Sequence, residues 1–148
     1  MISPEVLRRF PCFAPVSEES LKAVAMMARP ECLRAGRRLF GEGDPADRMS
    51  LIVDGAIDIQ YQLADGELRT LDTLIAGDIV GWSALVEPYK MTGTATAGKD
   101  TNLIMVDAKP LRALCERDPL LGYRLLKQVA RLLADRLDAA RVQLATAE

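Results

Sequence analysis

The sequence predicts a mainly β fold with flanking helices, a β-roll or jelly-roll barrel, on three observations. Residues 31–106 are short apolar runs separated by glycine and proline turns, which is typical of a sandwich or barrel. Helical patterns precede this stretch, and a long one follows it. The 148 residues are 49% hydrophobic and 27% charged, as in one globular domain. We expect a single domain over 1–148, with helices in 1–29, a β-roll in 30–107 and helices in 108–148.

Composition narrows the classes of function. The chain contains no histidine, which is the commonest general base and metal ligand, so we expect neither an enzyme nor a metal site. The three cysteines never form a C-x-x-C pair, which gives no sign of a disulfide framework or a zinc site. A net charge of -2 gives no reason to expect nucleic acid or an anionic membrane as partner. No signal peptide or bilayer-spanning stretch of about 18 apolar residues is present, so we expect a cytoplasmic protein.

Two short helices are predicted before the strands. Ser3 is a candidate N-cap for a helix over residues 4–10. Ser17 is a candidate N-cap for a second helix that ends before Pro30. The apolar stripe of this second helix consists of Leu21, Val24, Ala25 and Ala28.

The strands are predicted from apolar runs and the turns from the residues between them. The runs fall at 33, 39–40, 51–53, 57–61, 68–75, 95–97 and 103–106. Gly43-Asp44-Pro45 and Asp54-Gly55 are two of the turns. Ile57, Ile59 and Tyr61 alternate with polar residues, which predicts a strand with one face in water.

The segment 77–94, GDIVGWSALVEPYKMTGT, is expected to connect two strands through a glycine turn and one turn of helix. Gly81 permits the turn, residues 83–85 follow helically, and Pro88 stops the helix. Backbone N–H groups near residues 81–85 then lack intrahelical partners, which suits an anion. Local physics leaves two interpretations open, a plain barrel connection or an anion site.

The C-terminal part predicts two helices, the second one long. Asp107 is a candidate N-cap for a helix that stops at Asp118-Pro119. The long helix runs from Leu120 to about Ala145. Its apolar positions recur at steps of three and four residues, which predicts a homodimer surface, with folding back onto its own domain as the alternative. They include Leu126, Val129, Leu133, Leu137, Ala140 and Leu144.

The same helix carries a local excess of positive charge. Between positions 124 and 141 it has five basic and two acidic residues. We interpret the basic residues, which are Arg124, Lys127, Arg131, Arg136 and Arg141, as a solvated face. No helix–turn–helix pattern follows, so we do not expect direct DNA binding.

Three motifs, in order, resemble the cyclic-nucleotide-binding domain of the Crp/Fnr (catabolite activator) regulators and of cyclic-nucleotide-dependent kinases. Residues 40–47, FGEGDPAD, resemble the GE-G-x-P-A-D turn of that family, and residues 51–57, LIVDGAI, its strand pair. Residues 77–81, followed by Ala84 and Leu85, resemble the start of its phosphate-binding cassette. The resemblance runs from about Phe10 to the C-terminus. It implies a β-roll, a ligand held by segment 77–94, hereafter the cassette, and a dimer helix.

The sequence departs from the family at both recognising side chains. In the family, a glutamate of the cassette holds the ribose hydroxyl, and an arginine neutralises the cyclic phosphate. Trp82 and Met91 stand at these positions. A neutral thioether cannot replace a bidentate guanidinium, so we expect weak cyclic AMP binding or a different small anionic ligand, and no other cofactor. Trp82 either fills the nucleotide pocket or stacks on a flat ligand.

A shift of one residue would instead bring Lys90 to the phosphate as a point charge. The alternative is that Lys90 is an ordinary solvated side chain after a turn. The candidate ligand-binding residues are Gly81, Trp82, Ser83, Ala84, Leu85, Lys90, Met91, Thr92 and Thr94.

The sequence therefore predicts a stand-alone sensor or regulatory module that acts through a dimer helix or a partner protein. Two alternatives stay open. One is the effector-binding half of a Crp/Fnr-type transcription regulator. The other is a ligand-free protein interaction domain whose pocket is filled by Trp82 and Met91.

Overall fold

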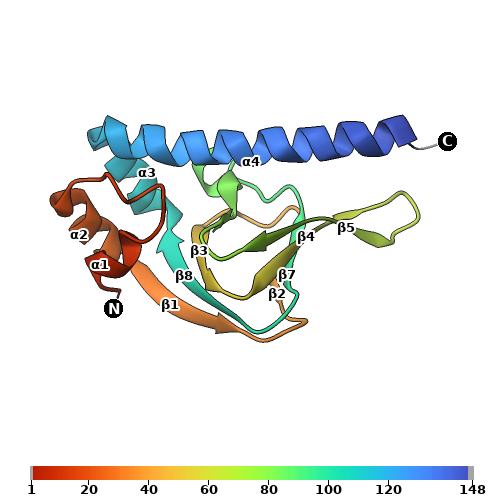
Figure 1. The fold of residues 1–148 in the computed structure, drawn as a ribbon, viewed down its shortest axis with the longest axis horizontal. Coiled ribbons are helices and arrows are strands. Elements are labelled where there is room, and N and C mark those ends of the chain that lie inside the picture. The colour runs from red at the N-terminus through yellow and green to blue at the C-terminus, as the bar shows by residue number, and fades with distance from the viewer. Residues whose placement is uncertain (1, 147–148) are drawn as a thin grey trace.

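Two antiparallel four-stranded sheets form the centre of the computed structural model, which describes residues 2–146 (Figure 1). One sheet has the strand order β1-β8-β3-β6 and the other the order β2-β7-β4-β5. The strands are β1 (Ala28–Leu33), β2 (Arg38–Phe40), β3 (Arg48–Asp54), β4 (Ala56–Gln62), β5 (Leu68–Ile75), β6 (Ile79–Val80), β7 (Thr94–Ala97) and β8 (Thr101–Asp107). The predicted β-roll is confirmed.

The apolar side chains form two clusters. One lies among the strands and consists of Ile52, Ile57, Ile59, Leu74, Val80, Ala95, Ala97 and Leu103. The other joins the helices to the sheet of β1, β8, β3 and β6, and its centre includes Phe13, Leu21, Met49, Leu111, Leu121 and Leu125. The second cluster is what positions the helices against the cassette.

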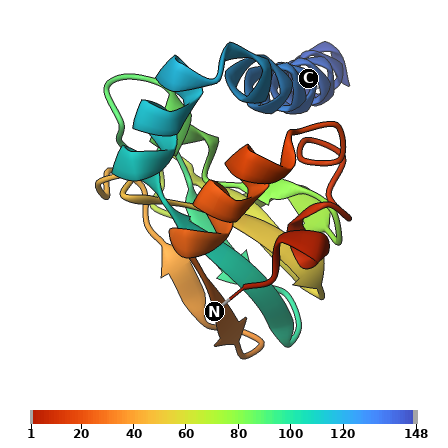
Figure 2. The same cartoon turned by 90° about the vertical axis from the view of Figure 1, so that its left-hand side faces the viewer.

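The helices are α1 (Pro4–Leu7), α2 (Glu18–Met26), α3 (Ala108–Arg117) and α4 (Pro119–Thr146), with a short 3-10 turn, η1 (Trp82–Leu85), after β6. Figure 2 shows the red N-terminal helices and α3 gathered at one end of the sheets, with α4 seen nearly end-on. Both predicted N-terminal caps are confirmed, because Ser3 accepts from Glu5 N and Ser17 from Ser20 N, each at 3.2 Å. Asp107 occupies the N-cap of α3 without a capping hydrogen bond.

The predicted N-terminal boundaries were wrong in two places. The first helix ends at Leu7 rather than residue 10. Strand β1 begins at Ala28, so Pro30 lies inside a strand instead of marking a helix end. Strand β1 is the edge of its sheet and pairs only with β8, and an edge strand tolerates proline because one side of its backbone needs no donor.

The turn between β3 and β4 requires glycine. Gly55 has φ of +103°, and a Cβ there would lie 2.6 Å from Thr101 Cα. The Thr101 hydroxyl also donates to Ala56 O and accepts from Ala56 N, both at 3.1 Å. Asp54-Gly55, predicted as a turn, is therefore the place where the chain passes from β3 in one sheet to β4 in the other.

Helix α4 has 28 residues, which is roughly 42 Å at 1.5 Å per residue. Figure 1 shows it running across the molecule, with its last turns on the side of the β4–β5 hairpin. Among residues 2–146, no helix combines the length and the apolar character that crossing a bilayer requires.

Candidate functional site

The cassette begins as the sequence predicts, with a left-handed glycine before one turn of helix. Strand β6 ends at Val80, Gly81 has φ of +86°, and η1 follows directly. Ala84 N donates to Gly81 O at 3.1 Å, which closes the turn. A Cβ at Gly81 would lie 3.2 Å from Arg48 O and 3.4 Å from Met91 Cε, so both backbone conformation and space demand glycine here.

Helix α3 holds the cassette through one arginine. Arg112 Nη1 donates to Ala84 O at 2.7 Å, and its guanidinium lies 4.0 Å from the centroid of the Tyr89 ring. A charge-assisted hydrogen bond to the short helical turn and a cation–π contact to the segment after it therefore join the cassette to α3. Sequence reasoning missed Arg112, because nothing in the local sequence marks an arginine of α3 as a neighbour of the cassette.

The returning half of the cassette is fixed to the turn that follows β2. Met91 N donates to Asp44 O, and Gly43 N donates to Met91 O, both at 2.8 Å. Met91 is 6% exposed and belongs to the helix-side apolar cluster. Lys90 is exposed and does not line the cavity that Met91 and Trp82 share. The structure therefore favours the interpretation of Lys90 as a solvated side chain.

A small cavity of about 20 Å³ lies between the cassette and α4. It is lined by Phe40, Ile59, Tyr61, Gly81, Trp82, Ser83, Met91, Thr92, Gly93 and Arg136. Ligand sites commonly measure roughly 300–1,000 Å³, so this space holds no nucleotide as it stands. Half-buried Trp82 and buried Met91 are among the side chains that enclose this small space.

Arg136 contributes the one cationic side chain among the residues that line this cavity. It is 9% exposed, and its Nε lies 3.6 Å from Asp72 Oδ2 without forming a hydrogen bond. The prediction that Arg136 belongs to a solvated face was wrong, because the side chain turns toward the β-roll. A buried guanidinium with an open donor at the cavity is a group that an anionic or carbonyl-bearing ligand would satisfy.

The other predicted cassette residues divide into structural and exposed positions. Ser83, Ala84 and Thr94 are buried, and Leu85 packs against the helix-side cluster. Thr94 Oγ1 accepts from Glu42 N at 3.3 Å, which commits it to the turn after β2. Thr92 is exposed and lines the cavity.

A second cavity, of about 260 Å³, also reaches Met91. Its walls come from the motif at residues 40–47 and from β3, and they include Asp44, Asp47 and Arg48. Met91 and Phe40 line both cavities, so these two side chains separate the space beside Trp82 from the larger one. In residues 2–146 the His, Cys, Asp and Glu side chains form no group of three that suits a metal ion.

The apolar positions of α4 lie in two rows. Leu121, Leu125 and Val129 are buried against the domain. A second row is exposed, with Leu126 at 49%, Leu133 at 36%, Leu137 at 52% and Leu144 at 77%. Ala140 is half-buried and continues this row. The prediction that Val129 belongs to the dimer surface was wrong, since Val129 is 3% exposed. Exposed Ala130 lies at the corresponding position of the second row, hereafter the outer row.

Comparison with known proteins identifies the family. The profile of the cyclic nucleotide-binding domain matches residues 30–118. The CRP-like cAMP-activated global transcriptional regulator of Mycobacterium tuberculosis is 27% identical over 129 residues, which cover 87% of this chain and 58% of that protein. The chain thus spans less than two thirds of that curated relative.

Solved structures agree with this match. A Geobacter metallireducens protein superposes with a TM-score of 0.81 at 31% identity, over 93% of this chain and 99% of that one. The N-terminal domain of a transcriptional regulator from Streptomyces coelicolor gives 0.68 at 30% identity, over 90% and 96%. The matched profile is that of a binding domain and indicates no catalytic family. The chain belongs to the cyclic nucleotide-binding domain family.

Proposed function

We propose that this protein is a regulatory sensor domain whose cassette binds cyclic AMP poorly and which signals through α4. The observation that carries the proposal is that Trp82 and Met91, the two residues that depart from the family, both line a cassette cavity of only about 20 Å³. A cyclic phosphate entering here would meet the neutral thioether of Met91, and a thioether supplies neither charge nor a hydrogen-bond donor.

The cavity also links the cassette to the long helix. Trp82 comes from η1 and Arg136 from α4, and both line the same space. A ligand large enough to enter would have to displace one of them, and displacement of Arg136 would shift α4 relative to the β-roll. Such a differential effect on two arrangements is what a ligand-controlled switch requires.

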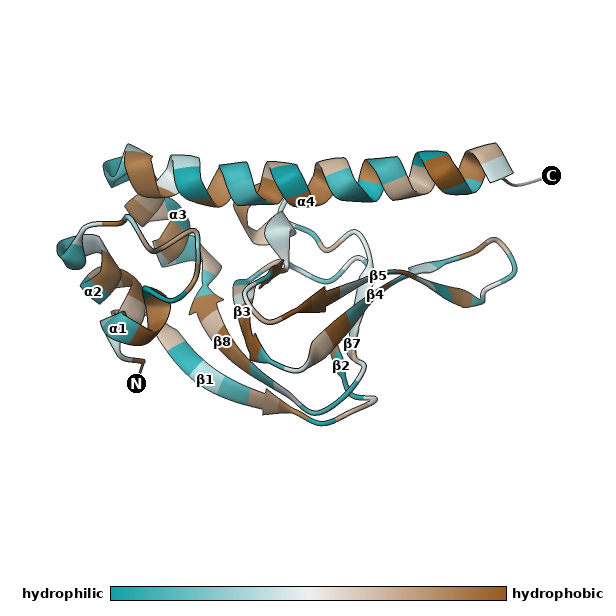
Figure 3. Ribbon diagram, viewed as in Figure 1, coloured by the Kyte–Doolittle hydropathy of each residue, from teal (hydrophilic) through white to brown (hydrophobic). Residues whose placement is uncertain are grey.

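We propose that the outer row of α4 pairs with a second copy of this chain. Its exposed leucines recur at steps of seven, four and seven residues, from Leu126 through Leu133 and Leu137 to Leu144. Figure 3 shows brown hydrophobic positions recurring along α4 up to its last turns. An exposed apolar stripe of this kind is costly in water unless a partner covers it.

A second candidate function is the effector-binding half of a transcription regulator. It is favoured by the match to part of the Mycobacterium tuberculosis regulator and by the fit to a regulator's N-terminal domain. Immunoblotting the protein from its native cells tests this, because a product much longer than 148 residues would support it.

The first test is isothermal titration of the full chain with cyclic AMP and cyclic GMP, with Trp82 fluorescence followed in parallel. Trp82 is the only tryptophan and lies in the cassette, so its emission reports on the site itself. We expect no binding in the micromolar range or tighter, because Met91 stands where the family has its phosphate-binding arginine and Arg136 already faces Asp72, with 3.6 Å between Nε and Oδ2. A micromolar or tighter dissociation constant would contradict the proposal.

The variant Trp82→Ala separates the two reasons for poor binding. If the tryptophan ring alone blocks the pocket, the variant gains affinity for cyclic AMP. If the missing charge at Met91 dominates, as we expect, Trp82→Ala binds no better than the parent chain.

A further inference from the structure

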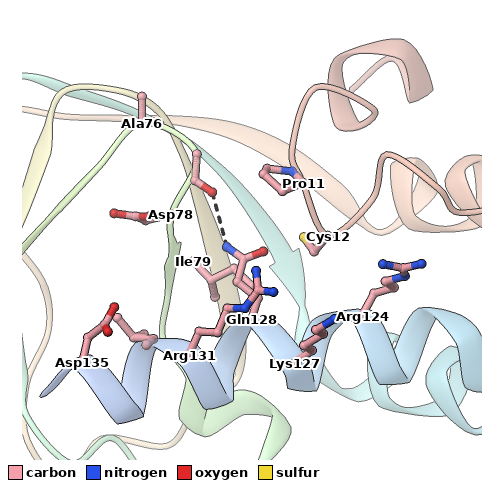
Figure 4. A pocket seen from close by; sticks show the side chains of 12 residues that line it. Pro11, Cys12, Ala76, Asp78, Ile79, Arg124, Lys127, Gln128, Arg131 and Asp135 are labelled. Atoms are coloured by element: carbon pink, nitrogen blue, oxygen red, sulfur yellow. Dashed lines mark hydrogen bonds between the residues drawn. The ribbon is translucent and has the colours of Figure 1, made fainter. Parts of the chain in front are cut away.

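A cavity larger than the two described above lies apart from the cassette cavity, with which it shares no lining residue. It is a cleft of about 410 Å³ between the N-terminal segment at Pro11 and Cys12, the turn 76–79 and one face of α4 (Figure 4). This volume falls within the range of small-molecule sites, roughly 300–1,000 Å³. The cleft therefore has room for a ligand in the present conformation, which the cassette cavity lacks.

Three basic side chains of α4 line this cleft, and none of them forms an ion pair within residues 2–146. They are Arg124, Lys127 and Arg131, which recur at steps of three and four residues and so lie on one face of the helix. The other charged residues that line the cleft are Asp78 and Asp135. Asp78 is already engaged, since its Oδ2 accepts from Ile75 N at 2.9 Å.

Arg124 is only partly exposed, and its buried Nε has no hydrogen-bond acceptor among residues 2–146. A buried donor without a partner is unfavourable, so the hydrogen-bonding capacity of this guanidinium is not used up within the described part of the chain. Burial raises the pKa of the Cys12 thiol to about 12, so this lining residue stays neutral and does not repel an anion.

The cleft also contacts the first residues of the cassette. Gln128 of α4 donates to Gly77 O at 3.4 Å, a bond drawn as a dashed line in Figure 4. Gly77 begins the turn that leads into β6, and β6 leads directly to Gly81 and η1. A ligand held here would therefore fix α4 against the start of the cassette.

We propose that this cleft binds a small polyanion, a molecule that carries two or more linked phosphate groups. Arg124 and Arg131 are seven residues apart, or about 10 Å along the helix, which a single phosphate cannot span. Guanidinium groups favour phosphate through paired hydrogen bonds, and linked phosphates carry the charge to meet all three cations. The inference goes beyond the cyclic-nucleotide proposal and stands whether or not the cassette binds a ligand.

The test is calorimetric titration of the full chain with inorganic tripolyphosphate, pyrophosphate and orthophosphate. We expect affinity to rise with the number of phosphates and to fall as salt is added, because the contacts are ionic. The double variant Lys127→Gln/Arg131→Gln should weaken tripolyphosphate binding by about tenfold or more, since each lost contact is charge-assisted. Both residues are exposed, so the variant leaves the core intact.

The matched control is Lys22→Gln/Arg117→Gln, which removes two equally exposed positive charges outside the cleft. We expect this control to bind tripolyphosphate like the parent. In the parent chain, binding of tripolyphosphate should slow hydrogen exchange at residues 76–79. Equal weakening in both double variants, no binding of tripolyphosphate, protection confined to residues 81–94, or tighter binding of a glutamate decapeptide would each overturn the proposal.

Discussion

The inner and outer faces of α4 both carry leucines, but those of the inner face are buried and those of the outer face are exposed. Leu125 is fully buried, and its neighbour Leu126 is 49% exposed. Both belong to rows with three- and four-residue steps, so the sequence pattern alone does not distinguish them. The difference teaches that one helix can complete the core of its own domain and still present a second apolar row at its surface.

The two rows also end at different places. The buried row consists of Leu121, Leu125 and Val129, and the next side chain that the helix buries is Arg136. The exposed row continues to Leu144. The first half of α4 is therefore anchored by apolar packing, and the second half has a single buried side chain, the charged Arg136.

The largest expected effect is a loss of stability, and it should be much greater for a substitution in the buried row than for one in the exposed row. Leu125→Ala removes a fully buried side chain and should lower the free energy of unfolding by about 2–5 kcal/mol. Leu126→Ala, one residue along, should cost less than about 1 kcal/mol when both are compared by urea unfolding at low protein concentration. Equal losses in the two variants would mean that the outer row also packs within one chain.

The next effect should appear in assembly rather than in folding. Leu133→Glu places a charge in the exposed row, so we expect light scattering to report half the parent mass while the circular dichroism spectrum is unchanged. Val142→Glu is the control, because Val142 is 63% exposed but lies off the row, and it should leave the dimer intact. A dimer that survives Leu133→Glu would move the interface to another surface.

Much of the fold follows from the sequence because the deciding signals are local. Alternating apolar residues predict the strands, and glycine positions such as Gly55 and Gly81 predict the turns, where φ is in fact positive. The first residues of strand β1 escaped prediction because proline indicates a helix end unless the strand is known to be an edge. Edge position is a property of the whole sheet, which no local window contains.

The candidate site was predictable only in part for the same reason. The motif spacing indicated Trp82 and Met91, and both do line the cassette cavity. Arg112 and Arg136 were missed, because their roles depend on Ala84 and Asp72, which are remote in the chain. A basic residue on a helix is usually solvated, and only the tertiary structure marks an exception.

The smallest effect concerns the joint where α4 begins. Ser20 of α2 donates its hydroxyl to Asp118 Oδ2 at 2.5 Å, and Leu121 N donates to the other carboxylate oxygen at 3.3 Å. The Ser20 hydrogen bond, ahead of those from backbone N–H groups, lowers the pKa of Asp118. A carboxyl whose pKa is lowered in the folded state stabilises the protein at neutral pH, and that contribution disappears as pH falls through the folded-state value.

Ser20→Ala should therefore destabilise the protein by at most about 1 kcal/mol at pH 7, with the difference from the parent shrinking in acid. Carboxyl carbon shifts followed by NMR should place the pKa of Asp118 higher in the variant than in the parent. Ser17→Ala is the informative companion, because it removes the cap of the same helix without touching Asp118 and should give a loss that does not depend on pH. A pH-independent loss in Ser20→Ala as well would show that Ser20 acts through packing alone, and that α4 is held at its start only by the inner row of leucines.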